Sequence, residues 1–416
     1  TDFDHATITV SELTDNMVSI DGAEHIRFQR LVFDTSRRSA ISGKGNSIEI
    51  NACEIVRQGT SGIQLKGKRN RITNCEIHQV GGTAVNLCGG QWKTLTPSGC
   101  VVENTHIHHW GGWQRVYCPA VKLAGVGHVV RHSRFNHFPH NAIEIRGNDH
   151  LIEYNLFQDG PTGFKDMGAI YGNLGAHPHQ RGTVIRRNFF QSTASAYPKQ
   201  CAIYPDNGTM GWLIEENIFY RNGNEGTPPM GAIKTNGGSY LTIRNNIFVD
   251  CASTFTQDYF LATWAKNKVG KYQQQWQTLM QTYDFKTLPH GKRYAGLLKL
   301  LEEDRIYPDS CLFERNLIWN PTIPLSHQPP FTSHGGPSAL IQSKDNFAAR
   351  SNPGFLDWKA GNFALHQNAT VFKNIPGFTP IPFDKIGLQQ PAGPAPRPVA
   401  GPQKSHPSPD QPSNRS

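Results

Sequence analysis

Three acidic side chains lie in segments that could carry chemistry. Asp166 follows Lys165 in FKDMGAIYGN, Asp206 lies in IYPDNG, and Glu144 lies in AIEIRG. Two carboxyl groups beside a glycosidic bond can cleave it, since one protonates the leaving oxygen and the other attacks or activates water. The neighbouring Lys165 would favour the ionised form of Asp166. We therefore expect Asp166 to be the base or nucleophile and Asp206 the acid, with Glu144 as the alternative carboxylate.

A repeat predicts the elements that position these residues. Segments that open with a small-apolar pair recur at steps of 22, 22, 36, 22, 27, 33 and 30 residues. Apolar and polar residues alternate within each segment, which predicts short strands with one buried face. A basic period of 22 residues, with insertions at one place, predicts stacked coils of three strands. We predict an all-β fold, a parallel β-helix, and the general crossover preference favours the right-handed form.

A second column shares this period and is small and polar throughout. Its members are Cys53, Cys75, Thr105, Ser133, Asn155, Asn188, Asn217, Asn246 and Asn316. Stacked amides can bond to one another and to the backbone at a tight corner, so we predict a side-chain ladder. Cys53 and Cys75 are interpreted as ladder members rather than disulfide partners. The eight cysteines contain no CxxC spacing, which argues against a zinc ribbon.

The rest of the chain divides by composition. We predict the β-helix over residues 1–251, a helical insertion over 252–309, the last coil and a closing segment over 310–385, and a disordered Pro-rich tail over 386–416. The opening TDFDHATITV reads as the interior of a strand pattern without a secretion signal, so we expect a processed chain or a fragment.

The chain is basic, which by itself would fit an anionic partner such as nucleic acid, an acidic glycan or a membrane surface. The formal net charge is +9, but Lys and Arg are scattered and form no long run, which is typical of a solvated surface. No apolar run reaches the length that spans a membrane. We expect no nucleic-acid and no membrane partner, and the sequence leaves the oligomeric state open.

The outward position after each apolar anchor forms a third column. Its members are Gln64, Asn86, Lys122, Glu144, Tyr171, Tyr204 and Lys234. Neighbouring strands lie about 4.8 Å apart, so these side chains would form a polar and aromatic ridge on which a glycan could lie. The alternative is a solvated face with cross-strand pairs such as Lys122 with Glu144.

Three coils lack the large apolar residue at the inward position two after the anchor. They carry Gly172, Pro205 and Thr235 instead. We expect the strands to end early there and to bend, which would bring Asn173, Asp206 and Asn236 beside the ridge. On a straight strand Asp166 and Asp206 would be roughly 23 Å apart, whereas glycosidase carboxylates lie about 5 to 9.5 Å apart. The pair therefore requires corners that fold both residues inward.

Histidines are frequent, and one is a candidate substrate contact. His140, three residues before an anchor, should face the same loop side as Asp166. His106 and His108 share a strand face, so zinc ligation is possible in principle, but no spacing matches a known zinc motif. We expect no metal and no cofactor.

Several ordered motifs carry a resemblance to a known family. The succession TPSGCVVENTHIHHWGGWQRVYCPAV, GNDHLIEYN, DMGAIYGN, IYPDNG and NNIFVDC resembles bacterial right-handed β-helix proteins near glycoside hydrolase family 141, over about residues 15–360. The resemblance implies a secreted enzyme that acts on plant or algal polysaccharide. Its acidic motifs fall on residues 165–171 and 204–208, and each keeps one acid, with Lys165 or Asn207 in place of the other.

Two other function classes remain open. A polysaccharide lyase or epimerase would use a base such as Lys122 or Lys234, together with an arginine or calcium that neutralises the sugar carboxylate. A non-catalytic glycan-binding β-helix would use the same ridge. All three imply a polysaccharide or oligosaccharide partner, with Tyr171, Tyr204, Asn173 and Asn236 as further contacts, and an extracellular or periplasmic location.

Overall fold

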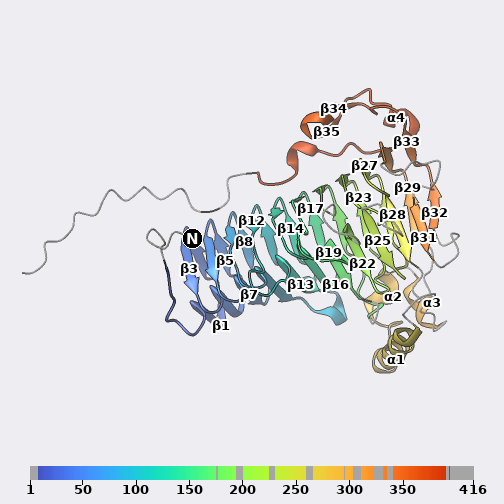
Figure 1. The fold of residues 1–416 in the computed structure, drawn as a ribbon. Helices are drawn as coiled ribbons and strands as arrows, with labels where there is room; N and C mark the ends of the chain where they lie inside the picture. Colours follow the sequence, from blue (N-terminus) through green and yellow to red (C-terminus); the bar gives the residue numbers. More distant parts are fainter. Residues whose placement is uncertain are drawn as a thin grey trace, which may run out of the picture.

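The computed structural model describes residues 8–174, 177–193, 200–223, 230–258, 266–294, 296–302, 311–321, 331–334, 341–389 and 393. The chain folds into the predicted right-handed parallel β-helix, in which each coil adds one strand to each of three sheets (Figure 1). Within the described residues each of these sheets has eleven strands. We name them sheets A, B and C in chain order.

The strands of each sheet follow one another at intervals of one coil. Sheet A comprises β1 (Val18–Glu24), β4 (Ile41–Asn46), β7 (Ile63–Lys66), β10 (Val85–Gly89), β13 (Val121–Val126), β16 (Ile143–Asn148), β19 (Met167–Asn173), β22 (Gln200–Asp206), β25 (Ile233–Asn236), β28 (Phe255–Asp258) and β31 (Phe331–His334). Sheet B comprises β2 (Arg27–Gln29), β5 (Glu49–Asn51), β8 (Arg71–Thr73), β11 (Val101–Glu103), β14 (Val129–Arg131), β17 (Leu151–Glu153), β20 (Val184–Arg186), β23 (Leu213–Glu215), β26 (Thr242–Arg244), β29 (Cys311–Glu314) and β32 (Ile341–Lys344). Sheet C comprises β3 (Val32–Ser36), β6 (Glu54–Gln58), β9 (Glu76–His78), β12 (His106–His108), β15 (Arg134–Asn136), β18 (Leu156–Gln158), β21 (Phe189–Gln191), β24 (Ile218–Tyr220), β27 (Ile247–Val249), β30 (Leu317–Trp319) and β33 (Phe347–Ala349).

The interior is filled by equivalent apolar residues of successive coils. One column consists of stacked phenylalanine rings, whose centroids lie 4.7 to 5.1 Å apart: Phe135, Phe157, Phe190, Phe219 and Phe248. All of these rings are fully buried. Because each ring packs against the equivalent rings of the neighbouring coils, the stack joins successive coils into one core.

The predicted asparagine ladder is present at a buried corner. Asn188 N donates to Asn217 Oδ1 at 3.0 Å, and Asn217 N donates to Asn246 Oδ1 at 2.9 Å. The Asn217 amide also donates to Ile185 O at 2.9 Å. Each amide therefore satisfies backbone groups that the corner would otherwise bury unpaired. Cys53 and Cys75 are buried free thiols, as predicted.

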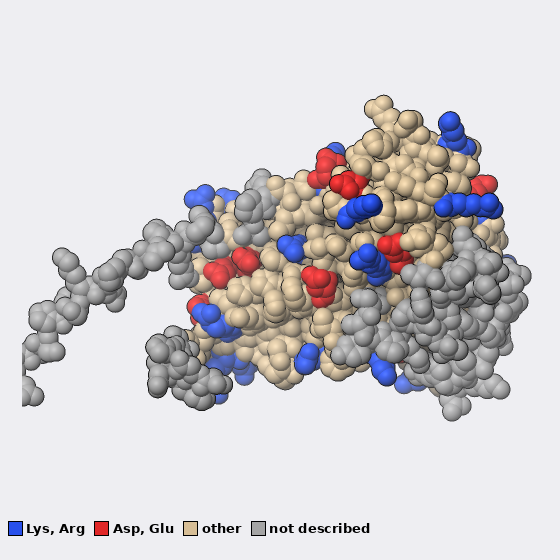
Figure 2. Space-filling view, turned by 45° about the horizontal axis from the view of Figure 1, so that its top comes forward, with Lys and Arg blue, Asp and Glu red and all other residues tan. Residues whose placement is uncertain are grey.

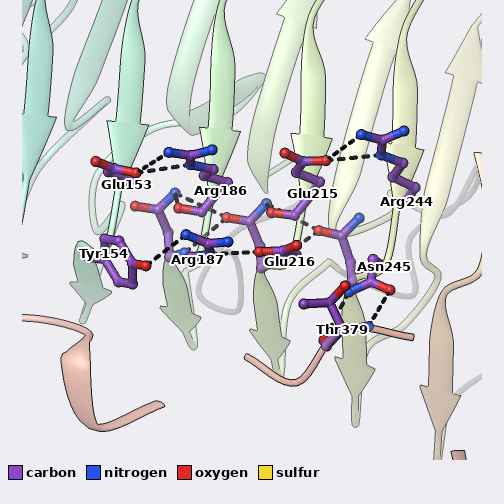
Figure 3. Close-up of polar contacts among 12 residues, drawn as sticks. Glu153, Tyr154, Arg186, Arg187, Glu215, Glu216, Arg244, Asn245 and Thr379 are labelled. Atoms are coloured by element: carbon purple, nitrogen blue, oxygen red, sulfur yellow. Dashed lines mark hydrogen bonds and ion pairs between the residues drawn. The ribbon is translucent and has the colours of Figure 1, made fainter. Parts of the chain in front are cut away.

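Ion pairs join neighbouring coils on the outer face of sheet B. Glu153 pairs with Arg186 and Glu215 with Arg244, each at 2.9 Å (Figure 3). On the face of the molecule drawn in Figure 2, acidic and basic side chains are likewise interspersed rather than gathered by sign. This distribution agrees with the scattered charges of the sequence.

The C-terminal segment folds back along the outside of the barrel. After β34 (Phe355–Asp357), β35 (Asn362–Leu365) and α4 (Val371–Asn374), the backbone of Thr379 exchanges two 3.0 Å hydrogen bonds with Asn245 (Figure 3). Further along, Gly387 N donates to Tyr154 O, and Gly393 N to Asn74 O, both at 2.8 Å. The segment thus returns toward the N-terminal coils (Figure 1).

The region predicted as a helical insertion contains helices, but it begins with a strand. Strand β28 continues sheet A within the range 252–309, and the helices α1 (Lys266–Thr282), α2 (Pro289–Arg293) and α3 (Leu297–Glu302) follow it. Strands β31, β32 and β33 then add a further coil beyond the single one predicted. Of the predicted tail, residues 386–389 and 393 are described, and 390–392 and 394–416 lie outside the described residues. No helix among the described residues is both long and apolar enough to span a membrane.

Candidate functional site

The predicted ridge exists on the outer face of sheet A. Lys122, Glu144, Tyr171 and Tyr204 are direct partners on the successive strands β13, β16, β19 and β22. Side chains alternate along a strand, so the residues two places further on also face outward. These residues are Arg146, Asn173 and Asp206, and the last two are themselves strand partners.

Gly172 has a different role from the predicted one. None of the three strands ends early. Strand β19 runs through Gly172 to Asn173, β22 through Pro205 to Asp206, and β25 through Thr235 to Asn236. A Cβ atom at position 172 would lie 2.6 Å from the indole of Trp212, which is buried in the core. The glycine therefore makes room for a tryptophan from a later coil. Asn173 and Asp206 reach the ridge by strand alternation rather than by a bend.

Asp206 is buried and surrounded by hydrogen-bond donors. The Tyr171 hydroxyl donates to Asp206 Oδ2 at 2.9 Å, and Asn236 Nδ2 donates to Oδ1 at 3.2 Å. Asn207 donates its backbone N–H to Oδ1 at 2.7 Å and its amide to Oδ2 at 2.9 Å. Burial raises the pKa of Asp206, and the charge of Asp166 raises it further, while these donors act in the opposite direction. A carboxyl group whose pKa is raised is suited to donate a proton.

Asp166 is brought toward the ridge by a close approach of two strands. Gly168 lies so near Tyr204 that a Cβ atom there would be 2.9 Å from Tyr204 N. The Asp166 carboxylate is exposed, and Oδ1 accepts the Tyr204 hydroxyl at 3.2 Å. Tyr204 and Asp206 leave the same face of β22 two residues apart, about 7 Å along the strand. Tyr204 thus contacts Asp166, and Tyr171 contacts Asp206. The rings of the two tyrosines pack edge to face, with centroids 5.7 Å apart, so they connect the two carboxylates.

Glu144 is held by two cations. Its Oε1 lies 3.3 Å from Lys122 Nζ and 2.8 Å from Arg146 Nε, and its side chain is 6% exposed. The pair between Lys122 and Glu144 is the cross-strand contact considered as the alternative for the ridge. Arg146 was not predicted as a site residue, although strand alternation places it on the same face.

A groove of about 650 Å³ runs between this part of sheet A and helix α1. Its walls include the predicted residues Lys122, Glu144, Tyr171 and Asn173, together with Tyr117, Arg146, His177, Lys271 and Tyr272. Asp206 does not line the groove itself but lies one hydrogen bond from Tyr171, which does. Asp166 and Tyr204 are likewise outside the lining of the groove. Tyr117 belongs to the long insertion before β13, and no pattern in the sequence marked it.

Two further predicted contacts, Lys234 and His140, each lie beside an aromatic residue of this region. Lys234 is buried, pairs with Asp258 at 3.0 Å and lies 5.1 Å from the Tyr204 ring centroid. His140 is buried, its Nδ1 lies 2.9 Å from Asn141 Oδ1, and its ring is 4.9 Å from that of Tyr117. Burial lowers the pKa of His140. Neither residue lines the groove: Lys234 contacts the ridge residue Tyr204, and His140 contacts Tyr117, which does line it.

Comparisons with known proteins concern the β-helix. The family described as "Right handed beta helix region" matches residues 2–114, which is less than half of the chain. No curated protein matches the chain. The narrower resemblance to glycoside hydrolase family 141 stays a prediction.

Solved structures to which the chain is similar include one named "Glycoside hydrolase", at 14% identity and a TM-score of 0.31 over 53% of this chain and 36% of that one. A mutant of the PL6 family alginate lyase AlyGC matches at 13% identity and a TM-score of 0.44 over 89% of this chain and 56% of that one. The alginate lyase AlyF-OU02 in complex with G6 matches at 12% identity and a TM-score of 0.44, over 88% and 89%. The chain thus spans about a third and just over half of the lengths of the first two.

Proposed function

We propose that the chain is a carbohydrate-active enzyme that binds a polysaccharide in the groove on sheet A and cleaves its glycosidic bonds by hydrolysis. The observation that carries this proposal is the environment of Asp206, a buried carboxyl group with a raised pKa that contacts the groove wall through Tyr171. Asp206 acts as the acid, because its protonated form is favoured by burial. The aromatic and amide side chains of the groove supply stacking surfaces and hydrogen-bond donors for a sugar chain.

The second carboxylate is Asp166 in the first instance. It is exposed to solvent, it is connected to Asp206 through Tyr204 and Tyr171, and a nucleophile or base must be open to substrate or water. Glu144 lines the groove and is the alternative. A polysaccharide substrate implies an extracellular or periplasmic location for this enzyme.

A lyase reaction is the second candidate, and the cations of the groove favour it. Lys122, Arg146 and Lys271 line the groove and could pair with the carboxylate of an acidic sugar. Elimination creates a conjugated double bond in the product, whereas hydrolysis creates only a new reducing end.

The two reactions are separated by incubating the protein with neutral and acidic plant and algal glycans. New reducing ends without ultraviolet absorbance would support hydrolysis, and reducing ends with absorbance would support elimination. Binding without either product across the panel would contradict an enzymatic role and favour a glycan-binding β-helix.

A further inference from the structure

A second polar cluster lies on the outer face of sheet C, away from sheet A. Strands β9 and β12 pair in register, so that Glu76 lies opposite His106 and His78 opposite His108. The inward residue between the two histidines, Ile107, is fully buried. Glu76, His106 and His108 therefore point away from the core together, at the junction of two neighbouring coils.

The donor atoms of this cluster have the spacing of a metal site. Glu76 Oε1 lies 3.5 Å from His106 Nδ1 and 3.3 Å from His108 Nε2. All three atoms lie within 4.8 Å of one another. In a tetrahedral zinc site with bonds of about 2.0 to 2.1 Å, neighbouring donors are about 3.3 Å apart. Small side-chain rotations would thus place the three donors around one ion.

The surrounding hydrogen bonds fix His106 in the orientation that a metal needs. His106 Nε2 lies 2.8 Å from Asn136 Oδ1, while Asn136 Nδ2 lies 2.6 Å from His137 Nδ1. With Nε2 as the donor to this amide oxygen, the neutral ring presents the lone pair of Nδ1 to the Glu76 carboxylate. Two acceptors then face each other, an arrangement that a cation between them stabilises. A hydrogen bond from the second ring nitrogen is also the usual support of a ligating histidine.

We propose that Glu76, His106 and His108 bind one divalent transition-metal ion, with zinc as the best match. Two imidazoles and one carboxylate suit zinc and its neighbours, whereas calcium and magnesium prefer sets of oxygen ligands. The side chains of the three residues are 17 to 35% exposed, so solvent can reach the ion and complete its coordination. Bound there, the ion joins β9 to β12 and stabilises the stacking of their coils. This site differs from the sequence-based expectation of no metal, because the carboxylate comes from the preceding coil, 30 residues before His106.

The test is a titration of the tag-free protein, treated with EDTA and then freed of it, with zinc chloride. Isothermal titration calorimetry measures the binding. We expect one saturable site and a rise in the thermal unfolding midpoint with zinc, since an ion that binds only the folded state stabilises it. Titration with cobalt chloride should give the intense visible absorption of tetrahedral coordination.

Matched variants decide which residues bind the ion. N136A removes an outer-shell partner of His106 and should weaken zinc binding by about 10- to 100-fold. H106Q, H108Q and E76Q each remove a proposed ligand, so each should weaken zinc binding by more than about tenfold. H366Q removes an exposed histidine far along the chain and should leave binding unchanged. Circular dichroism shows whether each variant is folded. A wild-type protein without saturable zinc binding, or folded H106Q and H108Q variants with wild-type affinity, would overturn the proposal.

Discussion

The Tyr171 hydroxyl donates a hydrogen bond of 2.9 Å to Oδ2 of the buried Asp206. Tyr171 lines the groove on sheet A and is the contact between this carboxyl group and the space in which a glycan would lie. The bond favours the carboxylate form of Asp206, whereas burial, the larger effect, favours the protonated form. The balance between the two sets the pH range in which Asp206 can act as an acid.

Replacement of Tyr171 by phenylalanine should shift the pH dependence of glycan cleavage. The loss of a donor to the carboxylate raises the pKa of Asp206 further, since that hydrogen bond lowers it. A general acid is lost as the pH rises through its pKa, so the alkaline limb of kcat against pH should move to higher pH in Y171F. Y220F is the control, and its pH profile should match that of the wild type, because the Tyr220 ring packs against Phe363 of the C-terminal segment. An unchanged limb in Y171F would contradict the role of Asp206.

Replacement of Gly172 by alanine should destabilise the fold. The new methyl group would lie 2.6 Å from the Trp212 ring, and overpacking of this kind costs about 1 to 3 kcal/mol. Urea unfolding followed by tryptophan fluorescence measures the loss. G112A is the control, because a Cβ atom there has its nearest neighbour, Val80 O, at 3.6 Å. Equal stability of the two variants would show that Trp212 can move away.

The sequence predicts the features that depend on period and alternation. The partners Lys122, Glu144, Tyr171 and Tyr204 were aligned by the repeat alone, because equivalent residues of stacked coils must meet in register. The asparagine ladder follows for the same reason.

The sequence does not predict contacts between residues at different phases of the repeat. Trp212, which lies 40 residues after Gly172 in the chain, fills the space beside that glycine. The spacing of the repeat does not predict that its indole enters the core. The path of the C-terminal segment to Asn74 likewise depends on a few backbone hydrogen bonds without a sequence period. For the same reason, the closeness of Asp166 and Asp206 could be stated only as a condition on the corners of the coils.

Removal of one ladder amide should destabilise the whole β-helix. In N217A the buried Asn188 N–H loses its acceptor, Asn217 Oδ1, and Ile185 O loses a donor. Each buried group left unpaired costs about 1 to 3 kcal/mol. We expect a drop of about 2 to 5 kcal/mol in the free energy of unfolding, measured by urea titration. N374A, at an exposed helical position, should change it little.

The protein should lose stability in mild acid through its buried histidines. His128 and His150 stack at 5.2 Å, and burial lowers their pKa values from 6.5 to about 4 and about 3. At a pH between the unfolded and folded pKa values, these imidazoles are protonated only in the unfolded chain. The free energy of unfolding therefore falls as the pH falls below 6.5. Each such histidine contributes a slope of about 1.4 kcal/mol per pH unit.

The contribution of His150 is isolated by H150Q. This variant should be less stable at neutral pH, because His150 Nδ1 accepts from His128 N and Nε2 donates to Arg146 O. Its free energy of unfolding should fall less steeply between pH 6 and pH 4, by about 1.4 kcal/mol per unit. H366Q should keep the wild-type slope, and a wild-type slope in H150Q would show that His150 is protonated in the folded protein.

The central claim is that Asp206 and Asp166 are the carboxyl groups of a glycan-cleaving site. The most direct measurement is kcat for release of reducing ends by D206N and D166N, beside D250N, whose carboxylate pairs with Arg221 outside the groove. We expect kcat to fall by about 10²- to 10⁴-fold in the first two variants and to stay near the wild-type value in D250N. Activity that persists in D206N and D166N would contradict the claim, and its loss in E144Q alone would move the chemistry to Glu144.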